Sequence, residues 1–161
     1  MRIAIIKSEF NLEVTDGLLA GAIAELKDGS YVFESEDLYS APGAFEIPVI
    51  AKKLTELNMY DGLICLGCVI KGDTAHFEYI SQVAANGISK VSIDAGIPIG
   101  FGILTTYSDE QAILRSQPNQ ENKGREAASA VLKTLITFDT ILGKESKRDK
   151  HSRNTETSSR I

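Results

Sequence analysis

The residues best placed to do chemistry lie in one run near the middle of the chain. An apolar stretch ending at Ile70 leads into a glycine turn, Lys71-Gly72-Asp73-Thr74, and then to His76 at the start of a helical pattern. The unpaired amides of a first helical turn and the helix dipole favour a bound anion. A histidine titrates near neutral pH and can move protons. Together these residues predict an enzyme that acts on a small phosphorylated substrate.

Three more groups of residues stand where predicted strands end or predicted helices meet. Phe10 either stacks on a flat ring or covers a helix end. Residues 44–46, Ala-Phe-Glu, follow a Pro-Gly turn, so their amides and carboxylate either bind a polyol or simply begin a helix. Arg115 and Lys123 flank the gap between two predicted helices, where they either close over a phosphate or remain solvated surface charges. No P-loop or dinucleotide-binding glycine motif is present.

The elements that must position these residues alternate between strand and helix. The patterns predict strands over residues 2–7, 31–35, 62–69 and 98–104. They predict helices from a cap at Asn11 to residue 28, and then over about 47–57, 74–94, 108–115 and 122–142. Such alternation predicts an α/β protein with a four-stranded parallel sheet in a three-layer α/β/α, flavodoxin-like arrangement. Ligands of such folds bind beyond the carboxyl ends of the strands.

The composition is that of an ordinary globular chain. Of 161 residues, 43% are hydrophobic and 24% charged, and no apolar run is long enough to span a membrane. No signal peptide is expected, since strand-like sequence begins at Arg2. Cys65 and Cys68 form a lone CxxC, for which buried thiols are a better interpretation than a redox or zinc site. Because side chains three apart in a strand point to opposite faces, we expect no disulfide and a cytoplasmic setting.

Charge is divided unevenly along the chain. Residues 143–161 hold six basic and three acidic side chains, a net charge of +3. Because the net charge of the whole chain is −5, residues 1–142 carry a net charge of −8. An acidic body argues against nucleic acid as a partner. The basic, Ser/Thr-rich tail predicts disorder, or else a segment that binds something anionic. We therefore expect one domain over residues 1–142 and a disordered polar tail over residues 143–161.

Taken together, the motifs resemble the lumazine synthase family. The resemblance covers residues 1 to about 142 and rests on five segments in the family's order and spacing: Phe10-Asn11, Pro42 to Pro48, Gly67 to Phe77, Phe101 to Thr105 and Asn122-Lys123-Gly124. Enzymes of this family condense 5-amino-6-(D-ribitylamino)uracil with 3,4-dihydroxy-2-butanone 4-phosphate. The products are 6,7-dimethyl-8-ribityllumazine, phosphate and water, in the penultimate step of riboflavin biosynthesis. The resemblance implies the same reaction here, with no cofactor and no metal.

The resemblance also implies a role for each candidate residue. His76 is the catalytic proton-transfer residue. The residues that bind the ribitylaminouracil are Phe10, Ala44, Phe45, Glu46, Cys68, Val69, Ile70 and Phe101, and those that bind the butanone phosphate are Asp73, Thr74, Arg115 and Lys123. The implied partners are the small-molecule substrates and further copies of the chain, in a homo-oligomer built on pentamers with active sites between adjacent subunits. Phe101 and Arg115 then reach each site from the neighbouring subunit. Pentamer, stacked pentamers and a larger shell all stay open.

Two departures from the family pattern and two alternatives accompany this hypothesis. Glu9 stands where the family commonly has Arg, and Lys71 where Arg is frequent. One alternative is the related archaeal-type riboflavin synthase, which joins two lumazines and needs no phosphate site. The glycine turn at Gly72 and the cation at Arg115 argue against it. The other alternative is a non-catalytic lumazine- or flavin-binding shell protein, which could lose His76 and Arg115, yet both are present.

Overall fold

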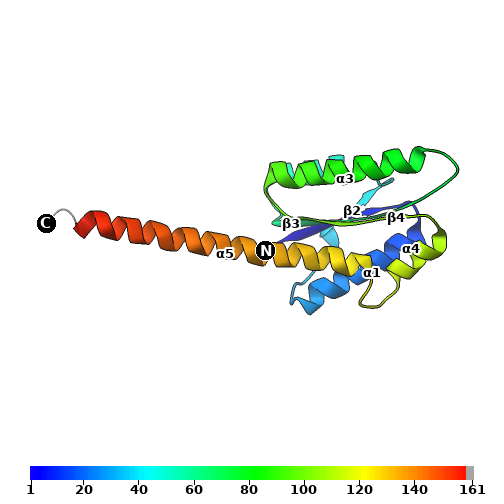
Figure 1. The fold of residues 1–161 in the computed structure, drawn as a ribbon. Coiled ribbons are helices and arrows are strands. Elements are labelled where there is room, and N and C mark those ends of the chain that lie inside the picture. The colour runs from blue at the N-terminus through cyan, green and yellow to red at the C-terminus, as the bar shows by residue number, and fades with distance from the viewer. Residues whose placement is uncertain (159–161) are drawn as a thin grey trace.

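The chain folds into a parallel sheet between two layers of helices (Figure 1). A computed structural model describes the backbone of residues 1–158 and the side chains of residues 1–143. The elements follow in the order β1 (Ile3–Ser8), α1 (Leu12–Asp28), the 3₁₀ turn η1 (Ser35–Asp37), β2 (Leu38–Ala41), α2 (Ile47–Glu56), β3 (Gly62–Ile70), α3 (His76–Ala95), β4 (Ile99–Thr106), α4 (Asp109–Ser116) and α5 (Lys123–Ser158). The four strands lie in the order β2-β1-β3-β4, which confirms the predicted α/β/α, flavodoxin-like fold.

Two apolar cores, one on each face of the sheet, explain the continuous apolarity of β3. Its side chains are buried from Gly62 to Cys68. Cys65 packs into the core beneath α2 and α3, whereas Cys68 packs into the core beneath α1 and α5. Side chains alternate between the faces of a strand, so both faces of this central strand must be apolar. The two cysteines are free, as the spacing predicted.

The second strand begins later than the sequence predicts. Residues 31–34 form no regular element, and the strand that pairs with β1 is β2, with Ile5 opposite Leu38. The alternating apolar residues that suggested a strand have another role. Tyr31 and Phe33 pack against the core beneath α1 and α5, and the Tyr31 hydroxyl accepts a hydrogen bond from the Ile3 amide at 2.7 Å. The prediction of a strand over residues 31–35 is therefore wrong.

An ion pair between a buried carboxylate and a half-exposed guanidinium anchors the start of β2. Asp37 is only 2% exposed, and its carboxylate accepts hydrogen bonds from the Arg2 guanidinium at 2.7 Å and the Tyr60 hydroxyl at 2.9 Å. These donors, Arg2 foremost, lower the pKa of the Asp37 carboxyl. Its contribution to stability is therefore present above the ordinary aspartate pKa and is lost as pH falls through the lowered one. The edge strand depends on a polar contact, which a hydrophobic pattern does not reveal.

Asn122 joins α1, α4 and α5. Its side chain is fully buried, and the amide nitrogen lies 3.0, 2.9 and 2.9 Å from the carbonyl oxygens of Gly17, Ser116 and Gln117. The side-chain oxygen accepts a hydrogen bond from the Gly124 amide at 2.8 Å, which caps the first turn of α5. One residue thus fixes where α4 ends and where α5 begins.

Glycines allow α5 to lie this close to α1. A Cβ at Gly124 would stand 1.9 Å from the carbonyl oxygen of Leu18, and one at Gly21 would stand 2.1 Å from the side-chain oxygen of Asn122. Real Cβ atoms essentially never approach backbone so closely, so any larger residue would push the two helices apart.

The last helix is longer than the sequence predicts. The apolar pattern ends near Leu142, but α5 continues as one helix to Ser158 and runs out beyond the body of the domain (Figure 1). Lys, Arg and Glu favour helix about as well as many apolar residues, so loss of the apolar stripe does not end a helix. The division into a domain over residues 1–142 and a disordered tail stays a prediction, because side chains are described only to Gly143. Within residues 1–158, no helix has the length and apolarity that crossing a membrane requires.

We expect Asn122→Ala to lower the free energy of unfolding by about 3–5 kcal/mol. The substitution removes a helix cap, typically ~1 kcal/mol, and leaves the Ser116 carbonyl, whose contact with Asn122 is buried, without that donor, ~1–3 kcal/mol. The partly buried carbonyls of Gly17 and Gln117 add a smaller loss. Urea denaturation of both proteins measures the change. Asn119→Ala is the matched control, since this exposed asparagine in the same loop accepts only from the Glu121 amide, at 2.9 Å. Equal losses in the two variants would contradict the role given to Asn122.

Candidate active site

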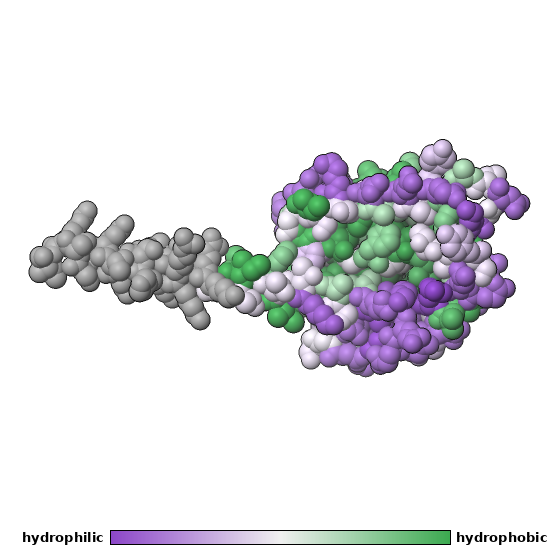
Figure 2. Space-filling model, viewed as in Figure 1, coloured by the Kyte–Doolittle hydropathy of each residue, from purple (hydrophilic) through white to green (hydrophobic). Residues whose placement is uncertain are grey.

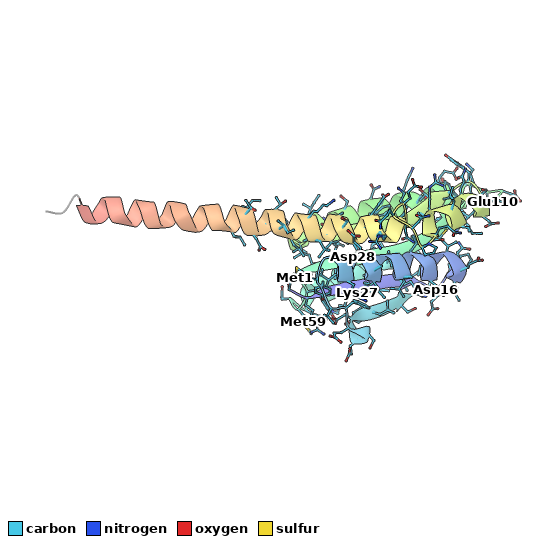
Figure 3. All side chains as sticks on the ribbon, turned by 90° about the horizontal axis from the view of Figure 1, so that it is seen from below. Met1, Asp16, Lys27, Asp28, Met59 and Glu110 are labelled. Carbon is cyan, nitrogen blue, oxygen red and sulfur yellow. The ribbon has the colours of Figure 1, made fainter. Side chains whose placement is uncertain are left out.

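A cavity of about 620 Å³ opens at the carboxyl ends of the strands. Its walls come from the turn after β1, the turn before α2, the end of β3 and the first turns of α3 and α4; the lining residues are Phe10, Asn11, Gly43, Ala44, Phe45, Glu46, Cys68, Val69, Ile70, His76, Ile80 and Asp109. Figure 3 shows the two ends of the sheet: Met1 and Met59, which precede β1 and β3, lie at one end of the body, and Glu110, which follows β4, lies at the other. The volume suits one small molecule.

The structure brings most of the sequence-predicted residues into this cavity. Those that line it are Phe10, Ala44, Phe45, Glu46, Cys68, Val69, Ile70 and His76. The structure does not bring Phe101, Arg115 and Lys123 there, because these three line a separate groove of about 560 Å³ along β4 and α5. The cavity and the groove share no lining residue. Asp73 and Thr74 line neither space; they lie exposed in the turn just before His76.

The groove follows the free edge of the sheet. β4 is an edge strand, and the Phe101 side chain that projects from it is 44% exposed. Figure 2 shows apolar surface gathered between the polar outer faces of the two helix layers. An exposed aromatic ring on an open strand edge is typical of a surface that meets a partner.

Asn11 fixes the turn that presents Phe10. Its backbone is left-handed, with φ 57°, and its side chain forms no cap at the start of α1. Instead the side-chain nitrogen donates to the carbonyl oxygen of Cys68 at 3.1 Å, which ties this turn to the end of β3. The Phe10 ring is left 69% exposed at the cavity. The sequence predicted the position of Asn11 at the helix start correctly but not its contact.

The glycine turn before α3 offers free amides. Within the described part of the chain, the backbone N–H groups of residues 72–75 donate to no protein acceptor, and the His76 amide lies 3.4 Å from the Thr74 hydroxyl oxygen. Lys71 beside this turn is engaged: its ammonium donates to Glu78 at 2.6 Å, which raises the pKa of Lys71, and lies 5.6 Å from the centre of the Phe77 ring. The turn itself therefore offers uncommitted backbone donors, whereas Lys71 is already paired.

Arg115 and Lys123 differ in how far they are committed. The exposed Arg115 guanidinium donates to the Gln111 carbonyl of its own helix at 3.0 Å, and no described carboxylate pairs with it. The Lys123 ammonium, by contrast, pairs with Glu126 at 2.6 Å. Arg115 precedes Ser116, whose carbonyl contacts Asn122, and Lys123 directly follows Asn122. Both cations therefore extend from backbone that this junction holds, and Arg115 is the less committed of the two.

Several cavity residues were not assigned from the sequence. Asn11, Gly43, Ile80 and Asp109 all line the cavity. Ile80 could have been found, since it lies one helical turn beyond His76 on α3. No group of three His, Cys, Asp or Glu side chains within the described residues is placed to hold a metal ion. A reaction without metal or cofactor stays a prediction.

Burial and a nearby negative charge keep the Cys68 thiol, at the floor of the cavity, in its protonated form. Burial foremost, and then the negative charge of Asp109, raise the pKa of Cys68 to about 11, while a hydrogen bond with Asn11 acts in the opposite direction. The thiol is thus neutral at physiological pH and serves as part of the wall. The effect of Asp109 also shows that its carboxylate acts on the interior of the cavity.

The fold and the cavity define an α/β enzyme with a small-molecule site at the strand ends. Residues 1–138 match the family model described as 6,7-dimethyl-8-ribityllumazine synthase. The relative named 6,7-dimethyl-8-ribityllumazine synthase 1 in Caulobacter vibrioides is 51% identical over 140 residues, which cover 87% of this chain and 92% of the relative. Another, in Nitratidesulfovibrio vulgaris strain Miyazaki F, is 44% identical over 141 residues, 88% of this chain and 90% of the relative. The chain belongs to the 6,7-dimethyl-8-ribityllumazine synthase family and is an enzyme of riboflavin biosynthesis, a transferase.

We expect Cys68 to react slowly with iodoacetamide in the folded protein. At pH 8.5 a thiol of pKa about 11 is thiolate in only a small fraction of molecules, so its rate should lie on the order of 10²-fold below that of an ordinary cysteine. The measurement uses Cys65→Ala, which leaves one thiol, and the same protein unfolded in urea is the control. Equal rates in the folded and unfolded protein would contradict the raised pKa.

Proposed function

We propose that the chain condenses 5-amino-6-(D-ribitylamino)uracil with 3,4-dihydroxy-2-butanone 4-phosphate in active sites shared between adjacent subunits of a pentameric ring. The observation that carries the shared site is the separation of the candidate residues. The cavity holds the ring-binding residues and His76, while Phe101, Arg115 and Lys123 line a groove that shares no residue with it. A cyclic oligomer joins two different faces of the chain, so it would place one subunit's groove against the next subunit's cavity.

The pyrimidine substrate occupies the cavity in this proposal. Phe10 stacks on the ring, since its own ring is exposed at the cavity and the turn that carries it is tied to the end of β3 by Asn11. The free amides of Ala44 and Phe45 and the carboxylate of Glu46 bind the ribityl chain and the ring edge. The backbone groups of Cys68, Val69 and Ile70 line the heterocycle. Phe101 of the adjacent subunit closes the cavity.

The phosphate of the second substrate binds between the glycine turn and the neighbouring groove. The amides of residues 72–75 have no acceptor within the described chain, and α3 adds the positive end of its dipole. Asp73 and Thr74 contribute their backbone and, for Thr74, a hydroxyl. Arg115 supplies a guanidinium that no described carboxylate neutralises, with Lys123 nearby. Charge-assisted hydrogen bonds of this kind contribute ~1.5–3 kcal/mol each.

The chemistry then needs proton transfer and positioning. The substrate amine attacks the ketone, and loss of water gives an imine. Elimination expels phosphate, and ring closure expels a second water. His76 lines the cavity as the first residue of α3, beside the turn, where it can pass protons between the amine, the carbinol and the leaving phosphate. Holding the two reactants together supplies much of the acceleration, a term that reaches ~7–11 kcal/mol in well-oriented cases.

Two finer assignments accompany this proposal. The free thiols of Cys65 and Cys68 support a cytoplasmic setting. The family match favours neither the archaeal-type riboflavin synthase nor a non-catalytic shell protein.

We expect the purified chain to form 6,7-dimethyl-8-ribityllumazine from the two substrates after treatment with a chelator. The reaction as proposed uses only positioning and proton transfer, so removal of metal should not slow it. Absorbance of the product measures the rate. An enzyme-free mixture is the control, because the amine and the ketone react without help. A rate no greater than that of the control would overturn the assignment.

We expect two damaged chains to restore activity to each other. Glu46→Arg blocks the cavity, and Arg115→Ala empties the groove. After joint dissociation and reassembly, roughly a quarter of the sites would combine an intact cavity with an intact groove. Activity is followed at a low concentration of the butanone phosphate. Glu46→Arg mixed with His76→Ala is the matched control, since both changes damage the cavity and no intact site can form. Mixed rings without restored activity would rule out a shared site.

A further inference from the structure

The cavity carries two carboxylates and no basic partner for them. Its ionisable carboxyl residues are Glu46 and Asp109; His76 and the neutral thiol of Cys68 are its other titratable groups. Neither Lys nor Arg is among the lining residues in the part of the chain that the structure describes. Whatever binds here meets hydrogen-bond acceptors and negative charge, whereas the free cation Arg115 lies in the other space.

Asp109 is placed in the cavity by the start of α4. The hydroxyl of Ser108 accepts a hydrogen bond from the Gln111 amide at 3.3 Å and caps the helix, which fixes Asp109 as its first residue. No described side chain pairs with the Asp109 carboxylate. Its charge is nevertheless felt at the cavity floor, because it raises the pKa of the Cys68 thiol. The exposed Asp109 carboxylate is therefore uncommitted within the described residues and lines the space that a bound molecule would occupy.

The two carboxylates reach the cavity from opposite layers of the fold. Glu46 immediately precedes α2, which packs on the core that contains Cys65, and Asp109 begins α4, whose Ala112 packs on the core that contains Cys68. An ionised carboxylate can only accept hydrogen bonds. A ligand that satisfies both must therefore carry donors at two separated positions. The ribitylaminopyrimidine has such donors in its hydroxyl, amine and ring N–H groups, whereas a phosphate dianion has none to offer and would be repelled.

We propose that Asp109 is a substrate-binding residue that selects the donor-rich pyrimidine over the phosphorylated substrate in the cavity. The inference rests on the proposed function and adds to it a second acceptor, opposite Glu46. Asp109 accepts a hydrogen bond from the pyrimidine substrate, and its charge keeps the butanone phosphate at the glycine turn and the cations of the groove. Each substrate is thus directed to its own half of the site by the sign of the charge that it meets.

Steady-state kinetics with two variants test the proposal. Asp109→Asn keeps an acceptor oxygen but removes the charge, and should raise the KM for the pyrimidine about threefold; Asp109→Leu removes both and should raise it about tenfold. The KM for the butanone phosphate should stay within about twofold of the wild-type value in each. Glu110→Gln is the matched control, since Glu110 follows Asp109 in the first turn of the same helix, carries the same charge and does not line the cavity. An unchanged pyrimidine KM in Asp109→Leu, or an equal change in Glu110→Gln, would overturn the proposal.

A second readout does not depend on catalysis. In the Cys65→Ala background, Asp109→Asn should speed alkylation of Cys68 by iodoacetamide, because the pKa of the thiol falls when the charge is removed, whereas Glu110→Gln should not. Added pyrimidine alone should slow alkylation in the parent protein and do so less effectively in Asp109→Leu. One outcome is that the parent forms no lumazine, while the pyrimidine protects Cys68 better in the parent than in Asp109→Leu. The proposed function then fails and the binding role of Asp109 stands. Lumazine formation together with Asp109-independent protection overturns the binding role alone.

Discussion

One buried amide, that of Asn122, determines how three helices meet. Its side chain is fully buried, and it satisfies the last carbonyls of α4, a carbonyl of α1 and the first amides of α5. The residues on either side of this junction are the ones that carry charge in the groove. Arg115 lies in the last turn of α4 and Lys123 is the first residue of α5, so the amide fixes the backbone from which both cationic side chains extend. A surface feature is thereby anchored to the core.

Separation of charge within the subunit has a physical advantage. If Arg115 lined the same cavity as Glu46 and Asp109, it would form an ion pair there, and a substrate would have to break that pair before binding. Holding the carboxylates at the strand ends and the guanidinium beside the sheet edge keeps these groups apart within one chain. The arrangement costs little in a single chain, because each group remains partly solvated.

Sequence patterns identified the fold and much of the cavity because both depend on where strands end. Glu46 and His76 follow directly from strand-end positions and helix starts. The patterns failed where a polar contact overrides periodicity: β2 is held at its start by buried Asp37, while the alternation of Tyr31 and Phe33 serves core packing instead. They could not separate Arg115 from the cavity either, since one-dimensional order does not show which side of an edge strand a loop will face. Such features depend on three-dimensional contact.

The opposed placement of Cys65 and Cys68 on β3 gives the chain two internal reporters. Each thiol lies in a different layer of the core, and neither is on the outer surface. Exchange of the Cys65 thiol with a dissolved disulfide requires the α2/α3 layer to open transiently, so its rate measures the local stability of that layer. Cys68 lines the cavity, so its exchange rate also depends on access through the cavity. The wild-type sequence thus contains one label for opening of the α2/α3 layer and a second label for the cavity.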